Sequence, residues 1–224
     1  MKIAVISLGG SLIAPDKIND DYIKKFRQTL LKFRDYKFVI VAGGGKTART
    51  YIDALENQKV DKFRQSLIGI RITRLNAWTL INLFKENCAK VIPKSLKDVK
   101  NLLIKNKIVV CGGLRYMEDN TSDGTAASIA NLLNTNLINM TNVNGLYNKD
   151  PKLKDSKLIR NISFENFHKI MEKIKYKPGQ HFVLDQHASE IIKKNKIKTY
   201  IIGPSLSNLE NLLKNKKFTG TTIS

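Results

Sequence analysis

The sequence of 224 residues has few of the side chains that build metal centres and disulfide frameworks. It contains two cysteines and three histidines. Cys88 and Cys111 stand alone, and no two histidines have the spacing of a metal site. We therefore predict no metal centre built by the chain and no disulfide. The low cysteine content indicates a reducing compartment such as the cytoplasm.

Long hydrophobic runs are also absent. No apolar run reaches the roughly 18 residues that a membrane-spanning helix needs. Residues 1–6 have the composition of a short signal peptide, but the glycine pair that follows and the lack of a clear basic leader favour a first β-strand. The sequence also lacks the motif of hydrolase serine nucleophiles and the P-loop motif. These absences argue against a membrane protein, a serine hydrolase and a P-loop enzyme.

Acidic residues are scarce relative to basic ones. The chain has 19 aspartates and glutamates against 39 lysines and arginines, which gives a formal net charge of +20. A polyanionic partner such as nucleic acid or a membrane surface is one interpretation. A solvated basic surface is the other, and it is favoured because the lysines are dispersed and no stripe of arginine alternates with aromatic residues. A small anionic substrate would also benefit from the positive field.

Segments that favour strands alternate with segments that favour helices along nearly the whole chain. The predicted strands are residues 2–8, 37–42, 89–92, 107–111, 136–141 and 198–202, and residues 220–223 can add an edge strand. The predicted helices are residues 19–34, 46–56, 63–86, 123–134, 163–174, 184–195 and 207–215. This alternation, without a repeat or linker, predicts a single α/β domain in which helices cover both faces of a mainly parallel sheet, a three-layer αβα sandwich.

Three of the predicted strands end in consecutive glycines. These are Gly9–Gly10, Gly43–Gly44–Gly45 and Gly112–Gly113. Bare backbone N–H groups bind phosphate closely, and glycine permits that approach. Ligands of open α/β sheets bind at the carboxyl ends of the strands, so three such loops in one domain predict a crevice for a polyphosphate. One such loop by itself is more typical of a tight strand-to-helix turn.

Three polar segments accompany these loops. Residues 121–127 begin with threonine, serine and Asp123 ahead of an alanine-rich run, which is typical of a helix N-cap. In the same crevice, Asp123 could also orient a cation or a lysine. Residues 141–151 combine polar groups with Tyr147, which suits a base and ribose or a plain turn, and they open a predicted loop or hairpin over residues 142–162. Residues 175–182 are predicted to form a second long loop.

The order of these motifs resembles the amino acid kinase superfamily, and within it the short, archaeal-type UMP kinases. The resemblance extends over essentially the whole chain. The motif Thr-Asn-Val-x-Gly-x-Tyr that starts at Thr141, followed by Asp150 and Pro151, is typical of the superfamily. The motif Ile-Thr-Arg-x-Asn-Ala at residues 72–77 and the short C-terminal ending narrow the resemblance to UMP kinases.

This resemblance implies the amino acid kinase fold and a specific reaction. ATP would be the phosphate donor, with Mg²⁺ bridging its phosphates, and UMP would be the acceptor, giving ADP and UDP for pyrimidine nucleotide synthesis. Residues from about 1 to 135 would bind the acceptor, and those from about 136 to 224 would bind ATP. Members of the family typically assemble as homo-oligomers, usually hexamers.

The resemblance also implies roles for individual residues. The transfer centre would comprise Gly10, Ser11, Lys46 and Asp123. ATP would be held by Gly10, Ser11, Gly45, Arg49, Thr141, Asn142, Tyr147 and Asp150. UMP would be held by Gly44, Ser66, Gly113, Leu114, Thr121 and Ser122.

Several positions depart from the family pattern. Many members carry a lysine in the first strand, where Ser7 and Leu8 stand here, and Lys46 is a candidate substitute cation. Ser66 stands where UMP kinases usually place an aspartate for the ribose, and a hydroxyl accepts hydrogen bonds less strongly than a carboxylate. The acceptor loop at residues 114–120 is longer than usual. These departures leave two alternatives open: a kinase for another small phosphate or carboxylate acceptor, and a non-catalytic nucleic-acid-binding or regulatory relative.

The implied chemistry agrees with the scarcity of histidine. Phosphoryl transfer between nucleotides requires two anionic groups held in line with their charge neutralised. The phosphate of UMP is already an ionised nucleophile, so the reaction needs no general base. Backbone N–H groups, Mg²⁺ and a few cations are sufficient.

Overall fold

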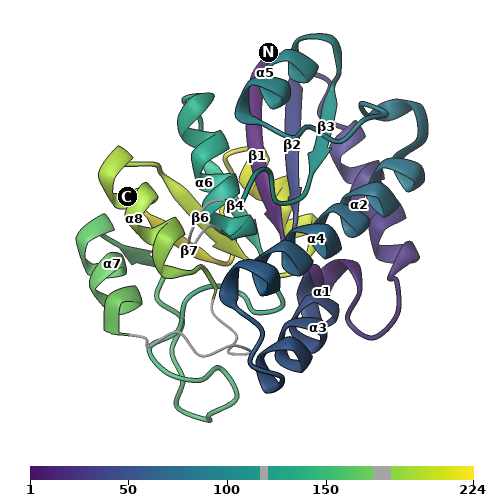
Figure 1. The fold of residues 1–224 in the computed structure, drawn as a ribbon. Helices are drawn as coiled ribbons and strands as arrows, with labels where there is room; N and C mark the ends of the chain where they lie inside the picture. The colour runs from purple at the N-terminus through teal and green to yellow at the C-terminus, as the bar shows by residue number, and fades with distance from the viewer. Residues whose placement is uncertain (117–120, 174–182) are drawn as a thin grey trace.

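The computed structural model describes residues 1–116, 121–173 and 183–224, and their strands form one seven-stranded sheet (Figure 1). The strand order is β3-β2-β1-β4-β6-β7-β5. The parallel strands are β1 (Lys2–Leu8), β2 (Tyr36–Ala42), β3 (Ile108–Cys111), β4 (Leu137–Met140) and β6 (Thr199–Ile202). At the far edge, β7 (Thr221–Ile223) is antiparallel to β6 and parallel to β5 (Asn161–Ile162).

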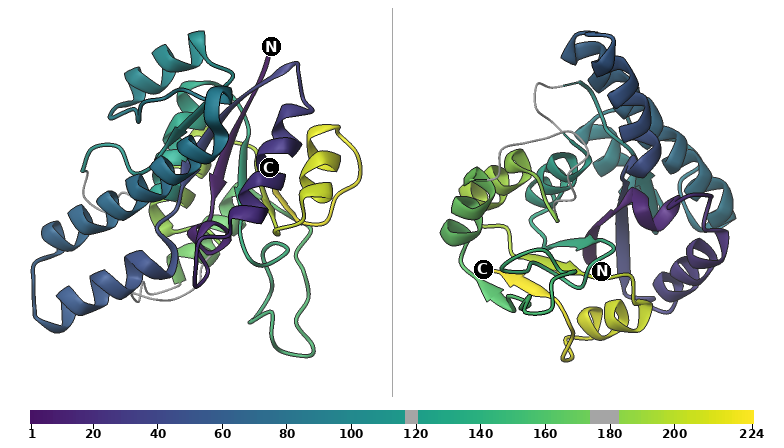
Figure 2. Two further views of the ribbon diagram at one scale, coloured as in Figure 1. Left: turned by 90° about the vertical axis from the view of Figure 1, so that its right-hand side faces the viewer. Right: turned by 90° about the horizontal axis from the view of Figure 1, so that it is seen from below.

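Helices cover both faces of this sheet (Figure 1). One layer contains α1 (Gly10–Ile13), α2 (Asp20–Leu31), α4 (Lys62–Phe84) and α9 (Leu206–Leu213). The other layer contains α5 (Leu96–Lys105), α6 (Ser122–Leu132), α7 (Phe164–Lys173) and α8 (Gln186–Asn195). The remaining helix, α3 (Gly45–Asn57), packs beside α4 as a hairpin (Figure 2), and a short 3₁₀ helix (Lys85–Asn87) follows α4. The predicted three-layer α/β sandwich is confirmed.

The period of two in the central strands explains the two layers. In β1, Ile6 and Leu8 pack against the α2–α4 side, whereas Val5, directly before Ile6, packs against the α6–α8 side. All three side chains have no exposed surface. Because successive side chains of a strand point to opposite faces, a continuous apolar run fills two cores at once, as expected for a parallel sheet covered on both sides.

One predicted strand is wrong, and the helix after it was not predicted. Residues 89–92 form no strand, although the Ala89 N–H donates to the Ile108 carbonyl at 2.9 Å. Val91 is 52% exposed, and Pro93 has no N–H with which to continue a ladder. The chain instead enters α5, where the Ser95 hydroxyl accepts from the Asp98 N–H at 3.1 Å. Exposure of Val91 and the proline that follows account for the missing strand.

Of the two predicted long loops, the structure describes the first and not the second. Within residues 142–162, Tyr147 and Leu158 form an isolated antiparallel bridge, and β5 closes the segment. The whole predicted loop at residues 175–182 and residues 117–120 of the loop at 114–120 lie outside the described residues, as does the end of the helix predicted to reach residue 174. Among the described helices, none combines the length and apolarity required to cross a bilayer.

Candidate active site

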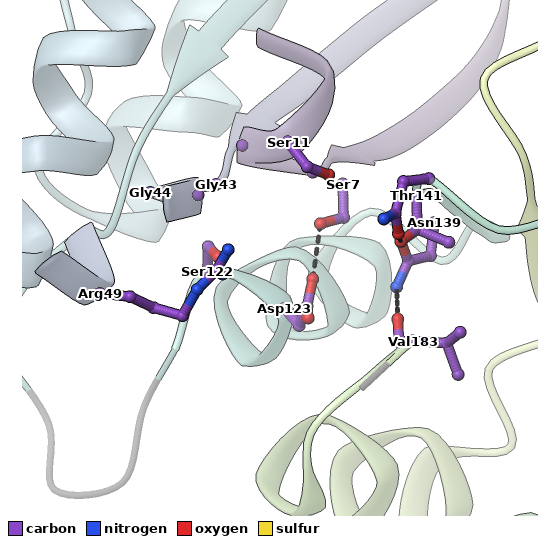
Figure 3. A pocket seen from close by; sticks show the side chains of 14 residues that line it. Ser7, Ser11, Gly43, Gly44, Arg49, Ser122, Asp123, Asn139, Thr141 and Val183 are labelled. Carbon is purple, nitrogen blue, oxygen red and sulfur yellow. Dashed lines mark hydrogen bonds between the residues drawn. The ribbon is translucent and has the colours of Figure 1, made fainter. Parts of the chain in front are cut away.

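The carboxyl ends of β1, β2 and β4 meet at one cavity. β2 and β4 flank β1 on opposite sides, so this is the switch point of the sheet, where open α/β proteins bind ligands. The cavity has a volume of about 150 Å³ (Figure 3). Its lining consists of Ser7, Gly9, Gly10, Ser11, Gly43, Gly44, Gly45, Arg49, Ser122, Asp123, Asn139, Thr141, Asn142 and Val183. The structure thus brings the first two glycine loops, the start of α6 and the end of β4 together.

The first two glycine loops are in direct backbone contact at this cavity. A Cβ atom on Gly10 would lie 2.1 Å from the backbone nitrogen of Gly45, closer than any side chain can approach. Gly45 also has a φ angle of +64°, in the left-handed region that favours glycine. The Asn76 amide donates to the Gly43 carbonyl at 2.7 Å and ties the second loop to α4. Backbone packing by itself therefore requires glycine here.

The helices that begin at these loops lack side-chain caps. Neither α1 nor α3 has a side chain that accepts from its first-turn N–H groups. By contrast, α2, α4, α5, α6, α8 and α9 are capped by Asn19, Asp61, Ser95, Thr121, Asp185 and Ser205. Uncapped N–H groups at a helix start carry partial positive charge and bind anions. The two uncapped N-termini line the same cavity, which suits a phosphate chain.

Asp123 reaches the cavity from the first turn of α6. The Ser7 hydroxyl donates to its Oδ1 at 2.7 Å (Figure 3). The residue is only partly buried, yet protein encloses its carboxyl group, and this desolvation is the main cause that raises its pKa to about 7. The nearby Asp185 carboxylate raises the pKa further, while the Ser7 hydrogen bond lowers it. A carboxyl group that titrates near neutral pH inside a cavity is typical of a functional site.

Asp185 is a neighbour that the sequence analysis did not identify. Its side chain caps α8 by accepting from the Ala188 N–H at 2.8 Å, and it also accepts from the Thr121 hydroxyl. Burial raises the pKa of Asp185 as well. Thr121 does not line the cavity; its hydroxyl accepts from the Gly124 N–H at 3.1 Å and caps α6. The available signal was the position of Asp185 directly before a helix, which by itself indicates only a cap.

Of the two candidate cations, one reaches the cavity and the other does not. Arg49, on the first turns of α3, contributes to the lining (Figure 3). The Lys46 amine instead lies 2.7 Å from Asp16 in an exposed ion pair, away from the lining residues. Arg49 is therefore the cation that the described part of the chain supplies to this cavity.

The predicted acceptor residues occupy two different places. Gly44 and Ser122 line the cavity, but Gly113, Leu114 and Ser66 do not. Ser66 is half-buried on α4. The third glycine loop is instead fixed to α4.

Two side chains of α4 hold the third glycine loop. The Gly113 N–H donates to the Thr73 hydroxyl at 2.8 Å. The Arg74 guanidinium donates to the Gly113 carbonyl at 3.0 Å and also to the Leu114 carbonyl. Thr73 and Arg74 belong to the motif at residues 72–77, which thus anchors Gly113 and Leu114 at the start of this loop, a contact that the motif alone did not reveal.

The predicted ATP residues after β4 are also divided. Thr141 and Asn142 line the cavity, whereas Tyr147 and Asp150 lie farther along the loop. Asp150 accepts from the Lys152 N–H at 3.0 Å in a local turn. Asn139, which the sequence analysis did not identify, lines the cavity and donates to the Val183 carbonyl (Figure 3). A buried amide within an apolar strand was its only sequence signal.

Comparison with known proteins agrees with this architecture. The model of the amino acid kinase family matches residues 2–203. A uridylate kinase of Methanococcus aeolicus is 35% identical over 229 residues, covering 100% of both chains. A uridylate kinase of Thermoplasma volcanium is 34% identical over 221 residues, covering 98% of this chain and 96% of the relative.

A solved structure supports the same relationship. The crystal structure of uridylate kinase from Archaeoglobus fulgidus superimposes with a TM-score of 0.85 at 32% identity, covering 100% of both chains. The sequence match and the structural match both extend over the cavity and over the strands and helices around it. The chain belongs to the amino acid kinase family.

Proposed function

We propose that this protein is a UMP kinase, which transfers the γ-phosphoryl group of ATP to the phosphate of UMP and yields ADP and UDP. One observation carries the proposal: the uncapped N-termini of α1 and α3 line one cavity with Asp123, in a chain similar over its whole length to uridylate kinases. Such an arrangement suits two phosphate groups held end to end.

The lining residues suggest how the transfer is assisted. Backbone N–H groups of Gly10, Ser11 and Gly45 would hold the donor phosphates, and Arg49 would neutralise charge as it develops. Asp123 would orient groups at the point of transfer. No general base is required, because the attacking phosphate oxygen is already ionised. Catalysis would consist of alignment and charge neutralisation.

Mg²⁺ is expected to enter with ATP. Within the described residues, no group of three or more histidine, cysteine, aspartate or glutamate side chains could hold a metal ion. Mg²⁺ prefers phosphate oxygens and water over protein cages, which fits this set of donors. When bound, it neutralises charge on the β- and γ-phosphates.

The position of the cavity supports a division between the two halves of the chain. The three strands before residue 135, β1 to β3, form one side of the sheet. The strands after residue 135, β4 to β7, form the other side. We assign UMP to the first half, with Ser66 and the loop that starts at Gly113, and the ATP nucleoside to the second, with Thr141 to Asp150. Cytoplasmic location, a homo-hexamer and a place in pyrimidine nucleotide synthesis complete the proposal.

The test is ADP release by the purified protein with ATP, Mg²⁺ and each of UMP, CMP, dUMP, AMP and a set of acyl-phosphate-forming carboxylates. We expect UMP to give the highest kcat/KM. The control without acceptor measures ATP hydrolysis and is subtracted. Turnover with another acceptor but none with UMP would overturn the assignment of UMP while leaving the kinase fold intact.

A further inference from the structure

The N-termini of α6 and α8 are joined by two side chains. Asp185 accepts from the Ala188 N–H at 2.8 Å with Oδ1 and from the Thr121 hydroxyl with Oδ2. The same Thr121 oxygen accepts from the Gly124 N–H at 3.1 Å. A continuous chain of hydrogen bonds therefore runs from the cap of α8 to the first turn of α6.

Asp123 lies within the helical turn that this chain of hydrogen bonds holds in place. It is the second residue of α6, between Thr121 and Gly124 in sequence, and its carboxyl group accepts from Ser7 of β1 at 2.7 Å. The first turn of α6 is thus held from β1 on one side and from α8 on the other. A change in either contact would alter where Asp123 points in the cavity.

Asp185 also contributes negative charge beside Asp123. Asp185 raises the pKa of Asp123, and the partly buried His187 of α8 lowers the pKa of Asp185. Arg49 of α3 lines the same cavity. Asp98 of α5 is held by Lys94 and Ser95, and His168 of α7 lies 3.1 Å from the Ser189 hydroxyl of α8 and 3.2 Å from Glu172. Asp185 is the one that acts on Asp123 as a like charge.

We propose that Asp185 is a positioning residue for Asp123: it fastens the first turn of α6 through Thr121 and places a second carboxylate beside the carboxyl group at the cavity. The activity measurement rests on the proposed UMP kinase function. The titration measurement does not, because it requires no substrate.

Two variants separate the hydrogen bond from the charge. Asp185→Asn removes the charge and retains a good N-cap for α8. Thr121→Val removes the hydroxyl but leaves Asp185 charged, and Thr121→Ser is its matched control because it keeps the hydroxyl. Each is measured by the pH dependence of kcat with UMP and by carboxyl ¹³C NMR titration of Asp123, with a thermal melt to establish folding.

We expect Asp185→Asn to move the Asp123 titration and the acid limb of kcat to lower pH, since a like charge has been removed. Thr121→Val should lower kcat about tenfold or more across the pH range, while Thr121→Ser stays within about twofold of wild type, as expected for a lost positioning contact. A merely structural role would leave the titration of Asp123 in place.

Two results would overturn the proposal: an Asp123 titration that is unchanged in Asp185→Asn, or a Thr121→Val variant as active as Thr121→Ser. If Asp185→Asn does not fold, the Thr121 pair still decides the positioning role. If the wild-type protein does not phosphorylate UMP, the proposed function fails, but the NMR titration still decides whether Asp185 acts on Asp123.

Discussion

At the scale of single residues, the main feature of the cavity is Asp123, a carboxyl group that is enclosed by protein without a cationic partner among its described hydrogen bonds. Asp123 has a hydroxyl partner, Ser7, where an ion pair would ordinarily stabilise an enclosed carboxylate. Burial and the Asp185 charge raise its pKa to about 7, and only the Ser7 contact opposes them. Such an arrangement sacrifices stability at neutral pH, which is typical of residues kept for function.

The first residue-scale prediction concerns Asp123→Asn. We expect kcat with UMP to fall about 10²-fold, the size of effect seen when one preorganised polar group is lost. Because the folded-state pKa is raised, Asp123 stabilises the fold below its ordinary pKa of 3.8 and loses that contribution as pH rises toward about 7. Relative to wild type, the melting temperature of the variant should therefore be higher at pH 8 and not at pH 4.

Asp98→Asn is the control for this prediction, because the pKa of Asp98 is lowered whereas that of Asp123 is raised. The hydrogen bonds from Ser95 and Lys94 lower the pKa of Asp98, so its contribution is present above pH 3.8 and is lost as pH falls. This variant should melt lower than wild type at pH 8, with kcat unchanged. A lower melting temperature for Asp123→Asn at pH 8 would contradict the account of Asp123.

At the scale of elements, the junction of α1 and α3 decides the shape of the cavity. Both helices start directly after a central strand, and their first residues touch through backbone atoms alone. This contact directs two uncapped N-termini toward one space. A side chain at the contact would separate them before it interfered with any ligand.

The element-scale prediction compares Gly10→Ala with Gly69→Ala. The new Cβ at residue 10 would lie 2.1 Å from the Gly45 nitrogen, so we expect a loss of about 1–3 kcal/mol in stability and loss of ATP binding. At residue 69, inside α4, the nearest atom is 3.4 Å away at Ile52, and alanine should stabilise the helix by about 0.5–1 kcal/mol. Urea unfolding and ATP calorimetry measure both. Normal ATP binding by Gly10→Ala would show that the contact is dispensable.

At the scale of the whole molecule, charge sets the behaviour toward polyanions. The net charge of +20 attracts small nucleotides and would also attract nucleic acid. The cavity, however, is lined by two uncapped helix N-termini, which suit phosphate groups, and the curated relatives are uridylate kinases. The basic surface is thus expected to assist substrate encounter.

The whole-molecule prediction is a weak salt dependence. Between about 50 and 200 mM salt, a protein with six or more phosphate contacts to nucleic acid loses about 10³-fold in affinity. Turnover with saturating ATP and UMP should change by less than about threefold, since screening acts mainly on exposed charges. Tight nucleic-acid binding that persists at the higher salt concentration, without UMP turnover, would favour the regulatory alternative.

Much of this fold could be predicted from local pattern. The apolar runs of β1 and β2 are strong signals because a strand buried on both faces is apolar at every position. The periodicity of α4 is a strong signal because a helix buried on one face has apolar residues at regular spacing. The run at residues 89–92 carries a similar signal but forms no strand, since Val91 is exposed and Pro93 follows. Strand formation depends on a partner with free hydrogen-bonding groups, which a local pattern does not reveal.

The sequence by itself determined the alternation of strands and helices, the glycines at the strand ends and the resemblance to the amino acid kinase family. Only the tertiary structure decided which polar groups meet. It brought Arg49 to the cavity and Lys46 to Asp16, and it set Asp185, 62 positions after Asp123 in the sequence, beside it. The physical reason is that chain pattern reports burial, whereas side-chain direction and pKa depend on neighbours contributed by distant segments.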